Sequence, residues 1–100
     1  MNTTRDITAD YPYTTADLER VHPSQIREGD LLASAGPVGS GRFAGRRVLA
    51  DAAYVGYSKT SADDIYSIEE ELPNGSTLHL RQPSRIHVWR VRADRRQVTA

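Results

Sequence analysis

The sequence predicts a mainly β protein, a small and strongly bent barrel of about five strands. Three observations support this prediction: five short segments have the composition of strands, glycine-containing loops separate them, and the last strand follows a proline turn. The chain of 100 residues is long enough for one domain with one hydrophobic core. We therefore expect a flexible arm over residues 1–15, a single β-barrel domain over 16–92 and a polar tail over 93–100.

The N-terminal arm is polar and has no periodic apolar pattern, and Tyr11 and Tyr13 are expected to pin its end to the domain. The next elements are predicted as a short strand or helical turn at 18–21, a helical turn at 23–26, a tight turn at 28–30 and a strand from 31. The tight turn suits Gly29, because glycine readily adopts a positive φ. The alternative for the first of these elements is a helix over 14–22 with Thr15 as its N-cap.

One long strand is predicted for residues 46–57, RRVLADAAYVGY, which are rich in valine and tyrosine. The two-residue period of a strand puts four side chains on one face: Val48, Ala50, Ala52 and Tyr54. A polar turn follows over 58–63, and two more strands are expected over 64–72 and 76–82.

The loop between these last two strands follows from which residues share a face, because the apolar residues of both strands are even-numbered. A two-residue turn would place Ile68 opposite Arg81 and bury the wrong side chains. A three-residue loop over 73–75 places Ile68 opposite Leu80 instead, with a left-handed glycine as its last residue. We therefore predict the three-residue loop, with Glu70 on the buried side at a local bulge or a sheet edge.

The last strand is predicted over residues 85–91, RIHVWRV, after a turn over 82–85. Its apolar residues fall on both faces, so we expect a strand covered on both sides that closes the sheet on an earlier strand. The predicted core of the domain consists of Val48, Ile68, Leu78, Leu80, Ile86 and Val88.

Four of these segments, SQIREGDLL, RRVLADAAYV, LPNGSTLHL and RIHVWRV, resemble small SH3-like β-barrel proteins of actinobacteria and their phages. The resemblance covers about residues 18–92 and implies an SH3-like barrel without known catalytic residues. Twelve of the thirteen basic residues are arginine and eleven residues are alanine, a composition typical of a GC-rich genome.

The composition also restricts the compartment and the chemistry. The chain contains no cysteine, so a disulfide framework and a thiolate metal site are excluded. No apolar run approaches the roughly 20 residues of a membrane span, and the N-terminus lacks the apolar core of a signal peptide. We expect a cytoplasmic protein without a membrane partner.

The stretch GPVGSGRF, residues 36–43, has the glycine spacing of a phosphate-binding P-loop. Arg42 and Phe43 stand where that motif requires lysine and serine or threonine, and a strand rather than a helix is expected to follow. We interpret the stretch as a loop between two strands whose amides and arginines remain candidates for contact with a phosphate.

The chain shows no arrangement that indicates an enzyme or a metal site. The three histidines, His22, His79 and His87, form no closely spaced pair in the sequence and have no cysteine beside them, and His79 is expected to pair with Glu69 on the surface of the hairpin. No Ser-His-Asp set and no carboxylate pair in an apolar setting stand out. We expect a non-enzymatic protein with no cofactor and no metal.

Acidic and basic blocks alternate along the chain, although the net charge is zero. Residues 76–100 carry six basic side chains and one acidic side chain, and Trp89 lies among them. Arginine suits phosphate groups and an exposed aromatic ring stacks on bases. The candidate ligand-binding residues are therefore Arg42, Arg46, Arg47, His79, Arg81, Arg85, Trp89, Arg90 and Arg92.

Two classes of function remain open at this point. The first is a module that binds nucleic acid or another phosphate-containing ligand through these arginines. The second is a protein-interaction module, such as a phage accessory or host-takeover factor, whose charged blocks orient a protein partner or a second copy of the chain. Under a third interpretation the arginines have no ligand: Trp89 belongs to the core and they keep the rim of the barrel soluble.

Overall fold

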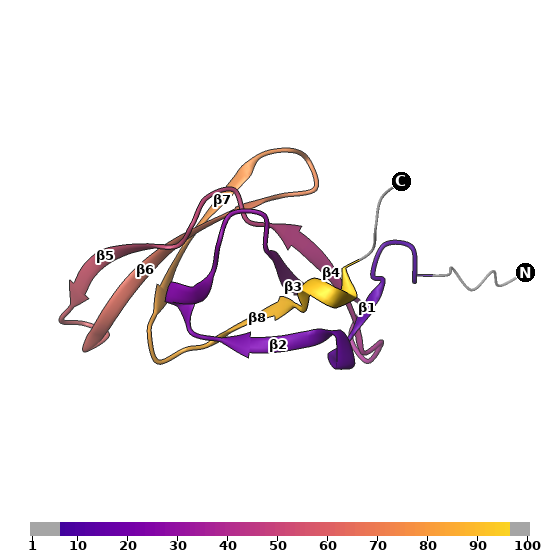
Figure 1. Cartoon of the computed structure of the whole chain (residues 1–100), viewed down its shortest axis with the longest axis horizontal. Coiled ribbons are helices and arrows are strands. Elements are labelled where there is room, and N and C mark those ends of the chain that lie inside the picture. Colours follow the sequence, from indigo (N-terminus) through magenta and orange to yellow (C-terminus); the bar gives the residue numbers. More distant parts are fainter. Residues whose placement is uncertain (1–6, 97–100) are drawn as a thin grey trace, which may run out of the picture.

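The computed structural model describes residues 7–96 and is mainly β (Figure 1). Its strands are β1 (Tyr13–Thr14), β2 (Leu18–Val21), β3 (Leu31–Ala35), β4 (Arg42–Arg47), β5 (Ala53–Ser58), β6 (Asp63–Glu71), β7 (Thr77–Pro83) and β8 (Val88–Val91). Three single turns of 3₁₀-helix complete the elements: η1 (Thr15–Asp17), η2 (Pro23–Gln25) and η3 (Ala93–Arg95). None of the helices in the described residues is long and apolar enough to cross a membrane.

The strands form two sheets. A curled sheet has the strand order β1-β4-β3-β8-β2, and a second sheet has the order β5-β6-β7. In Figure 1 the hairpin of β5 and β6 extends to the left, away from the curled sheet, and the molecule is elongated, with extents of 54 × 30 × 27 Å. We call this second sheet the projecting sheet.

The predicted long strand over residues 46–57 is wrong, because the chain changes sheets within it. β4 ends at Arg47 and β5 starts at Ala53. Between them the amide of Val48 donates to Asp30 O at 2.8 Å, and the amide of Ala52 donates to Ile26 O at 3.0 Å. Because these amides bond to residues 30 and 26, residues 48–52 do not continue one strand from β4 into β5. Val48 and Tyr54 therefore do not share a face as predicted: Val48 is buried and Tyr54 is exposed.

The predicted hairpin is confirmed. Ile68 lies opposite Leu80, Leu72 N donates to Ser76 O at 2.8 Å, and Gly75 has a φ of +86°. Glu70 is buried as expected. Of the bulge or sheet edge predicted at Glu70, the bulge is absent between β6 and β7, whose register runs without a shift from Ile65 to Glu71, and on its other side β6 pairs with β5 only as far as Ser67.

Two apolar clusters hold the molecule together. The first lies between the curled sheet and the projecting sheet and contains Val21, Ile26, Leu32, Val48 and Ile68, with Ala52, Leu80 and Val88 packed against it. The second lies on the other face of the curled sheet, as strand alternation shows, and contains Tyr13, Leu18 and Val91, with Leu31, Ala33 and Phe43.

The predicted core is partly confirmed. Val48 and Ile68 are buried, and Leu80 and Val88 are partly buried against the first cluster. Ile86 was placed wrongly: it is 50% exposed, because β8 starts only at Val88 and Ile86 belongs to the preceding turn. The amide of Ile86 closes that turn on Pro83 O at 3.0 Å.

The described structure extends past both ends of the expected domain. Tyr13 is buried and pairs with Phe43 in β4, and Arg96 bonds to Asp30. The alternative helix over 14–22 does not form, because η1 ends at Asp17 and β2 follows. The Asp17 carboxylate fixes η1 by accepting from the amide of Thr14 at 2.8 Å. The turns predicted at 23–26 and 28–30 are confirmed, and Gly29 has a φ of +88°.

Candidate functional site

The arginines of the basic block were the main functional candidates in the sequence, and several of them bind within the protein. Arg42 donates through Nε to Tyr11 O at 3.0 Å and through Nη2 to Pro12 O at 3.2 Å. It therefore tethers the segment before β1 to the edge of the curled sheet. The loop of residues 36–41 before it is followed by a strand, as expected, and Gly36 N closes this loop on Arg42 O at 2.8 Å.

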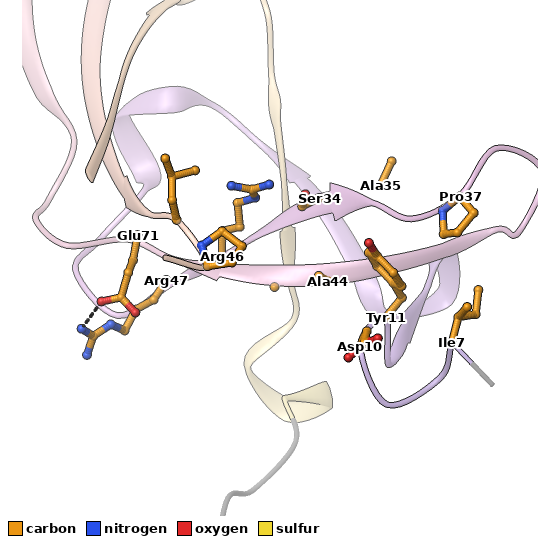
Figure 2. A pocket seen from close by; sticks show the side chains of 13 residues that line it. Ile7, Asp10, Tyr11, Ser34, Ala35, Pro37, Ala44, Arg46, Arg47 and Glu71 are labelled. Carbon is orange, nitrogen blue, oxygen red and sulfur yellow. Dashed lines mark hydrogen bonds and ion pairs between the residues drawn. The ribbon is translucent and has the colours of Figure 1, made fainter. Parts of the chain in front are cut away.

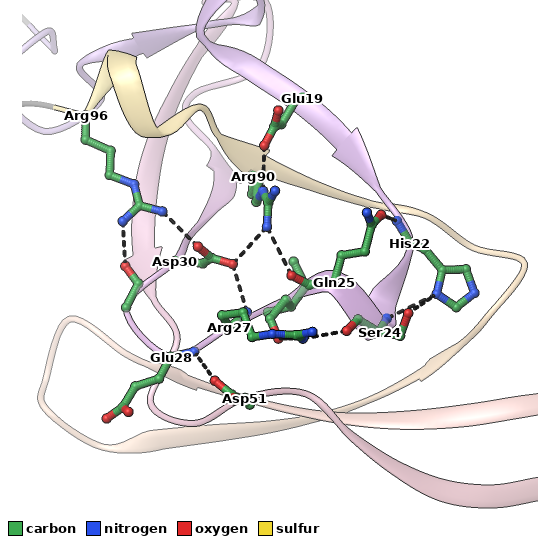
Figure 3. Close-up of polar contacts among 12 residues, drawn as sticks. Glu19, His22, Ser24, Gln25, Arg27, Glu28, Asp30, Asp51, Arg90 and Arg96 are labelled. Atoms are coloured by element: carbon green, nitrogen blue, oxygen red, sulfur yellow. Dashed lines mark hydrogen bonds and ion pairs between the residues drawn. The ribbon is translucent and has the colours of Figure 1, made fainter.

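Asp30 is the centre of a charged network in which it forms ion pairs with two more arginines (Figure 3). Arg90 bonds to Glu19 at 2.6 Å and to Asp30 at 3.1 Å, and Arg96 bonds to Asp30 at 2.9 Å. Burial raises the pKa of Asp30, but the Arg27 amide and the two guanidinium groups outweigh it, so the pKa lies below its usual value. Arg90 thus neutralises the molecule's own carboxylates.

Three further candidates have internal partners or a close internal counter-charge. Arg47 pairs with Glu71 at 2.8 Å, and Arg92 donates through Nε to Leu18 O at 3.3 Å. Burial raises the pKa of Glu70, and the charge of Arg46 partly offsets this effect. Arg46 is the cation that compensates a buried carboxylate.

His79, Arg81, Arg85 and Trp89 are exposed. His79 Nδ1 lies 3.5 Å from Glu69 Oε1, which confirms the predicted surface pair. Trp89 is 49% exposed and lies opposite Arg20 in the pairing of β8 with β2, so its ring is not a core side chain. Because Trp89 and Arg90 are consecutive residues of one strand, they point to opposite faces. The structure does not bring the nine candidates onto one surface.

A cavity of about 730 Å³ lies between β3, β4 and the segment after β6 (Figure 2). Tyr11 and Pro37 line one end, and Arg46, Arg47 and Glu71 line the other. The lining contains two arginines and two carboxylates, Asp10 and Glu71, so its formal charges balance and select no particular class of ligand.

The most unusual surface in the described residues is β5, and the sequence analysis missed it. Tyr54, Val55 and Tyr57 are 59%, 46% and 63% exposed. The sheet pairs only one edge of β5, with β6, so the backbone groups of its outer edge have no strand partner in residues 7–96.

A bulge shapes the side chains of this strand. The register shifts between Tyr54, which lies opposite Tyr66, and Gly56, which lies opposite Ile65. Val55 is therefore the extra residue, and Gly56 takes a φ of +143° that favours glycine. Tyr57 then lies opposite Asp64, so both exposed tyrosines share the face of Tyr66 and Asp64.

Ring contacts and one hydrogen bond hold part of this tyrosine face in place. The Tyr54 and Tyr66 rings are 5.7 Å apart, edge to face, and the Tyr66 and His22 rings are 5.6 Å apart. Tyr54 Oη also donates to Asp64 at 3.2 Å. Contacts that hold an exposed ring in place lower the entropy lost when a partner covers it.

The other sheet edges in the described residues are protected. β1 has two residues, β2 carries Glu19 and Arg20, and β7 carries His79 and Arg81 and ends at Pro83. Short length, charge and proline are the usual ways in which proteins prevent strands from pairing at an edge. Within Ala53–Ser58 no residue is charged and none is proline. β5 has none of these three protections, and its bulge at Val55 is the edge protection that it carries.

No protein-family model, curated protein or solved structure matches this chain. Among residues 7–96, no group of three or more His, Cys, Asp and Glu side chains is placed to hold a metal ion.

Proposed function

We propose that the protein is a non-enzymatic protein-interaction module that binds its partner along the outer edge of β5. The observation that carries this proposal is the combination of an unpaired strand edge with exposed Tyr54, Val55 and Tyr57. An extended partner segment adds to such an edge by main-chain hydrogen bonds, and side chains on the two faces supply selectivity.

The composition of this surface supports a protein partner. Tyrosine is enriched in protein interfaces, because it offers a large rigid contact area and a hydroxyl group at a low entropy cost. Several of the arginines that indicated a phosphate ligand are engaged within the protein, as Arg42, Arg47 and Arg90 show.

Site-specific photo-cross-linking of the full chain tests this proposal. A photoreactive phenylalanine analogue at Tyr57 should cross-link to a defined protein in cells that express the gene natively. The same analogue at Thr77, an exposed residue on the opposite edge of the same sheet, is the matched control. Equal cross-linking patterns from both positions would exclude β5 as the docking edge.

Nucleic-acid binding is a second proposal, and the exposed Trp89 with Arg20 opposite it favours this function. An indole beside a guanidinium group is a stacking platform for bases, and Arg81 and Arg85 are also exposed. Trp89 is the one tryptophan of the chain, so its fluorescence should fall when single-stranded DNA or RNA binds at low salt.

The salt dependence of that binding identifies it as electrostatic. For a single strand the affinity falls with a slope of about −0.7 per phosphate contact on a log–log plot of affinity against salt concentration. Substitution of Arg20 and Arg85 by alanine should then weaken binding and reduce the slope. Unchanged fluorescence at tens of micromolar oligonucleotide would exclude this function and leave the protein-interaction module.

We also propose that the curled sheet is a form of SH3-like barrel. Its two edge strands, β1 and β2, follow one another in the sequence with only η1 between them. The resemblance to small barrel proteins of actinobacteria and phages supports a cytoplasmic accessory factor that binds a host protein.

A further inference from the structure

We propose that the partner at β5 is a second copy of this chain, so that two β5 strands pair antiparallel about a two-fold axis and join two projecting sheets into one of six strands. This inference rests on the proposed function and names the partner of the same edge. A two-fold interface requires that one surface complement itself.

The sequence of β5 has this self-complementarity. Read forwards, Ala53–Ser58 is small, Tyr, Val, Gly, Tyr, small, and its reverse has tyrosine at the same two positions. Antiparallel pairing about a two-fold axis between Val55 and Gly56 puts Ala53 opposite Ser58 and Tyr54 opposite Tyr57 of the other copy. Cross-strand aromatic pairs are among the favourable contacts of a sheet.

The bulge places these tyrosines where a dimer needs them. Because Tyr54 and Tyr57 lie on one face of the sheet, the two-fold axis brings four tyrosines, two from each copy, together on that face. Tyr66 and Asp64 already hold Tyr54 from the same face. The cluster therefore extends an existing aromatic contact across the axis.

Charge also permits this pairing. β5 carries no charge, so two copies approach without repulsion at the edge. Just outside the strand, the same register places Lys59 of one copy opposite Ala52 of the other, next in sequence to the exposed Asp51. The Asp51 carboxylate is already positioned, because it accepts from the Glu28 amide at 2.8 Å.

The position of β5 in the molecule leaves room for a second copy. In Figure 1, β5 forms the outer side of the projecting sheet, away from the curled sheet. A short strand and four tyrosines bury an area at the low end of specific interfaces, which is the range of transient pairs. We therefore expect a dimer that forms at micromolar concentration.

Sedimentation velocity on the full chain tests this proposal between about 1 and 500 μM, a range that spans the affinities of transient pairs. The mass should rise from 11.1 kDa toward twice that value as the concentration increases. Val55→Lys should stay monomeric at all these concentrations, because a lysine on an edge strand blocks pairing. Thr77→Lys, the control on the opposite edge, should dimerise like the original chain.

Cysteine variants test the register, because the chain has no cysteine of its own. When Ala53→Cys and Ser58→Cys chains are mixed, the mixed disulfide dimer should form faster than either disulfide between identical chains. Thermal melts of every variant confirm that it is folded.

Two outcomes would overturn this inference. The first is an 11.1 kDa monomer at the highest concentration, and the second is a dimer that survives Val55→Lys but is lost in Thr77→Lys. If the chain is monomeric but the photoreactive residue at position 57 still cross-links to a different protein, the proposal of a second copy is contradicted and the proposed function is retained. A monomer without such a cross-link contradicts both.

Discussion

The curled sheet and the projecting sheet place charged and apolar side chains in opposite ways. In the curled sheet, charged groups bond inside the molecule, with Asp30 between Arg90 and Arg96. In the projecting sheet, Tyr54 and Tyr57 face solvent. Groups that are satisfied within a protein stabilise it, whereas exposed apolar rings gain free energy only when another surface covers them. This difference is the basis of our proposal that the curled sheet is the scaffold and that β5 of the projecting sheet is the interaction surface.

The largest effect is expected at the junction of the two sheets. Ile68 belongs to β6 and is buried in the cluster that joins the projecting sheet to the curled sheet. Ile68→Ala should lower the free energy of unfolding by about 2–5 kcal/mol, measured by urea denaturation. Leu80 is the cross-strand partner of Ile68 and is only partly buried, so Leu80→Ala should lower the free energy of unfolding by a smaller amount. Equal costs would show that the cluster does not centre on Ile68.

A smaller effect, confined to the scaffold, is expected from Asp30→Asn. This change leaves the guanidinium groups of Arg90 and Arg96 without their shared carboxylate and should cost about 1–3 kcal/mol at neutral pH. The folded pKa of Asp30 lies below its unfolded value. The contribution of Asp30 to the free energy of unfolding is therefore present above its pKa in the unfolded chain. It is lost as the pH falls through its pKa in the folded protein.

The pH dependence supplies the check on this prediction. Below about pH 4, close to the unfolded pKa of an aspartate, the difference in stability between Asp30→Asn and the original chain should shrink. A difference that stays constant down to pH 2 would mean that the charge of Asp30 contributes nothing.

The smallest of these effects is expected at the tip of the projecting sheet. Gly75 has a φ of +86°, and a Cβ added there would meet nothing within 4 Å. Gly75→Val should therefore cost only the backbone strain, about 1–2 kcal/mol. Gly75→Asn is the matched control and should be milder, because asparagine tolerates this conformation. If the valine variant melts like the original chain, the loop has rearranged.

The hairpin of β6 and β7 could be predicted from the sequence because its information is local. The parity of Ile68 and Leu80 fixes the register, and a glycine stands where a positive φ is needed. The interruption after Arg47 could not be predicted in this way. It depends on backbone bonds from Val48 and Ala52 to residues of the segment before β3.

The candidate site was less predictable than the fold, for the same physical reason. Arg90 counted as a surface cation in the sequence, but its partners Glu19 and Asp30 lie 71 and 60 residues away. The exposure of Tyr54 follows from a bulge and from an edge position, and both depend on pairing between strands. The absence of charge and proline in AYVGYS is the one signal that the sequence carried for this surface.

Hydrogen exchange of the β5 amides tests most directly whether this edge is where the protein associates. The exchange is followed at a low and a high protein concentration, on the original chain and on Val55→Lys. We predict that amides on the outer edge of Ala53–Ser58 exchange quickly in dilute protein and slowly in concentrated protein, and that Val55→Lys removes this dependence. Exchange that is equally fast at both concentrations, with protection appearing in another strand instead, would contradict the account.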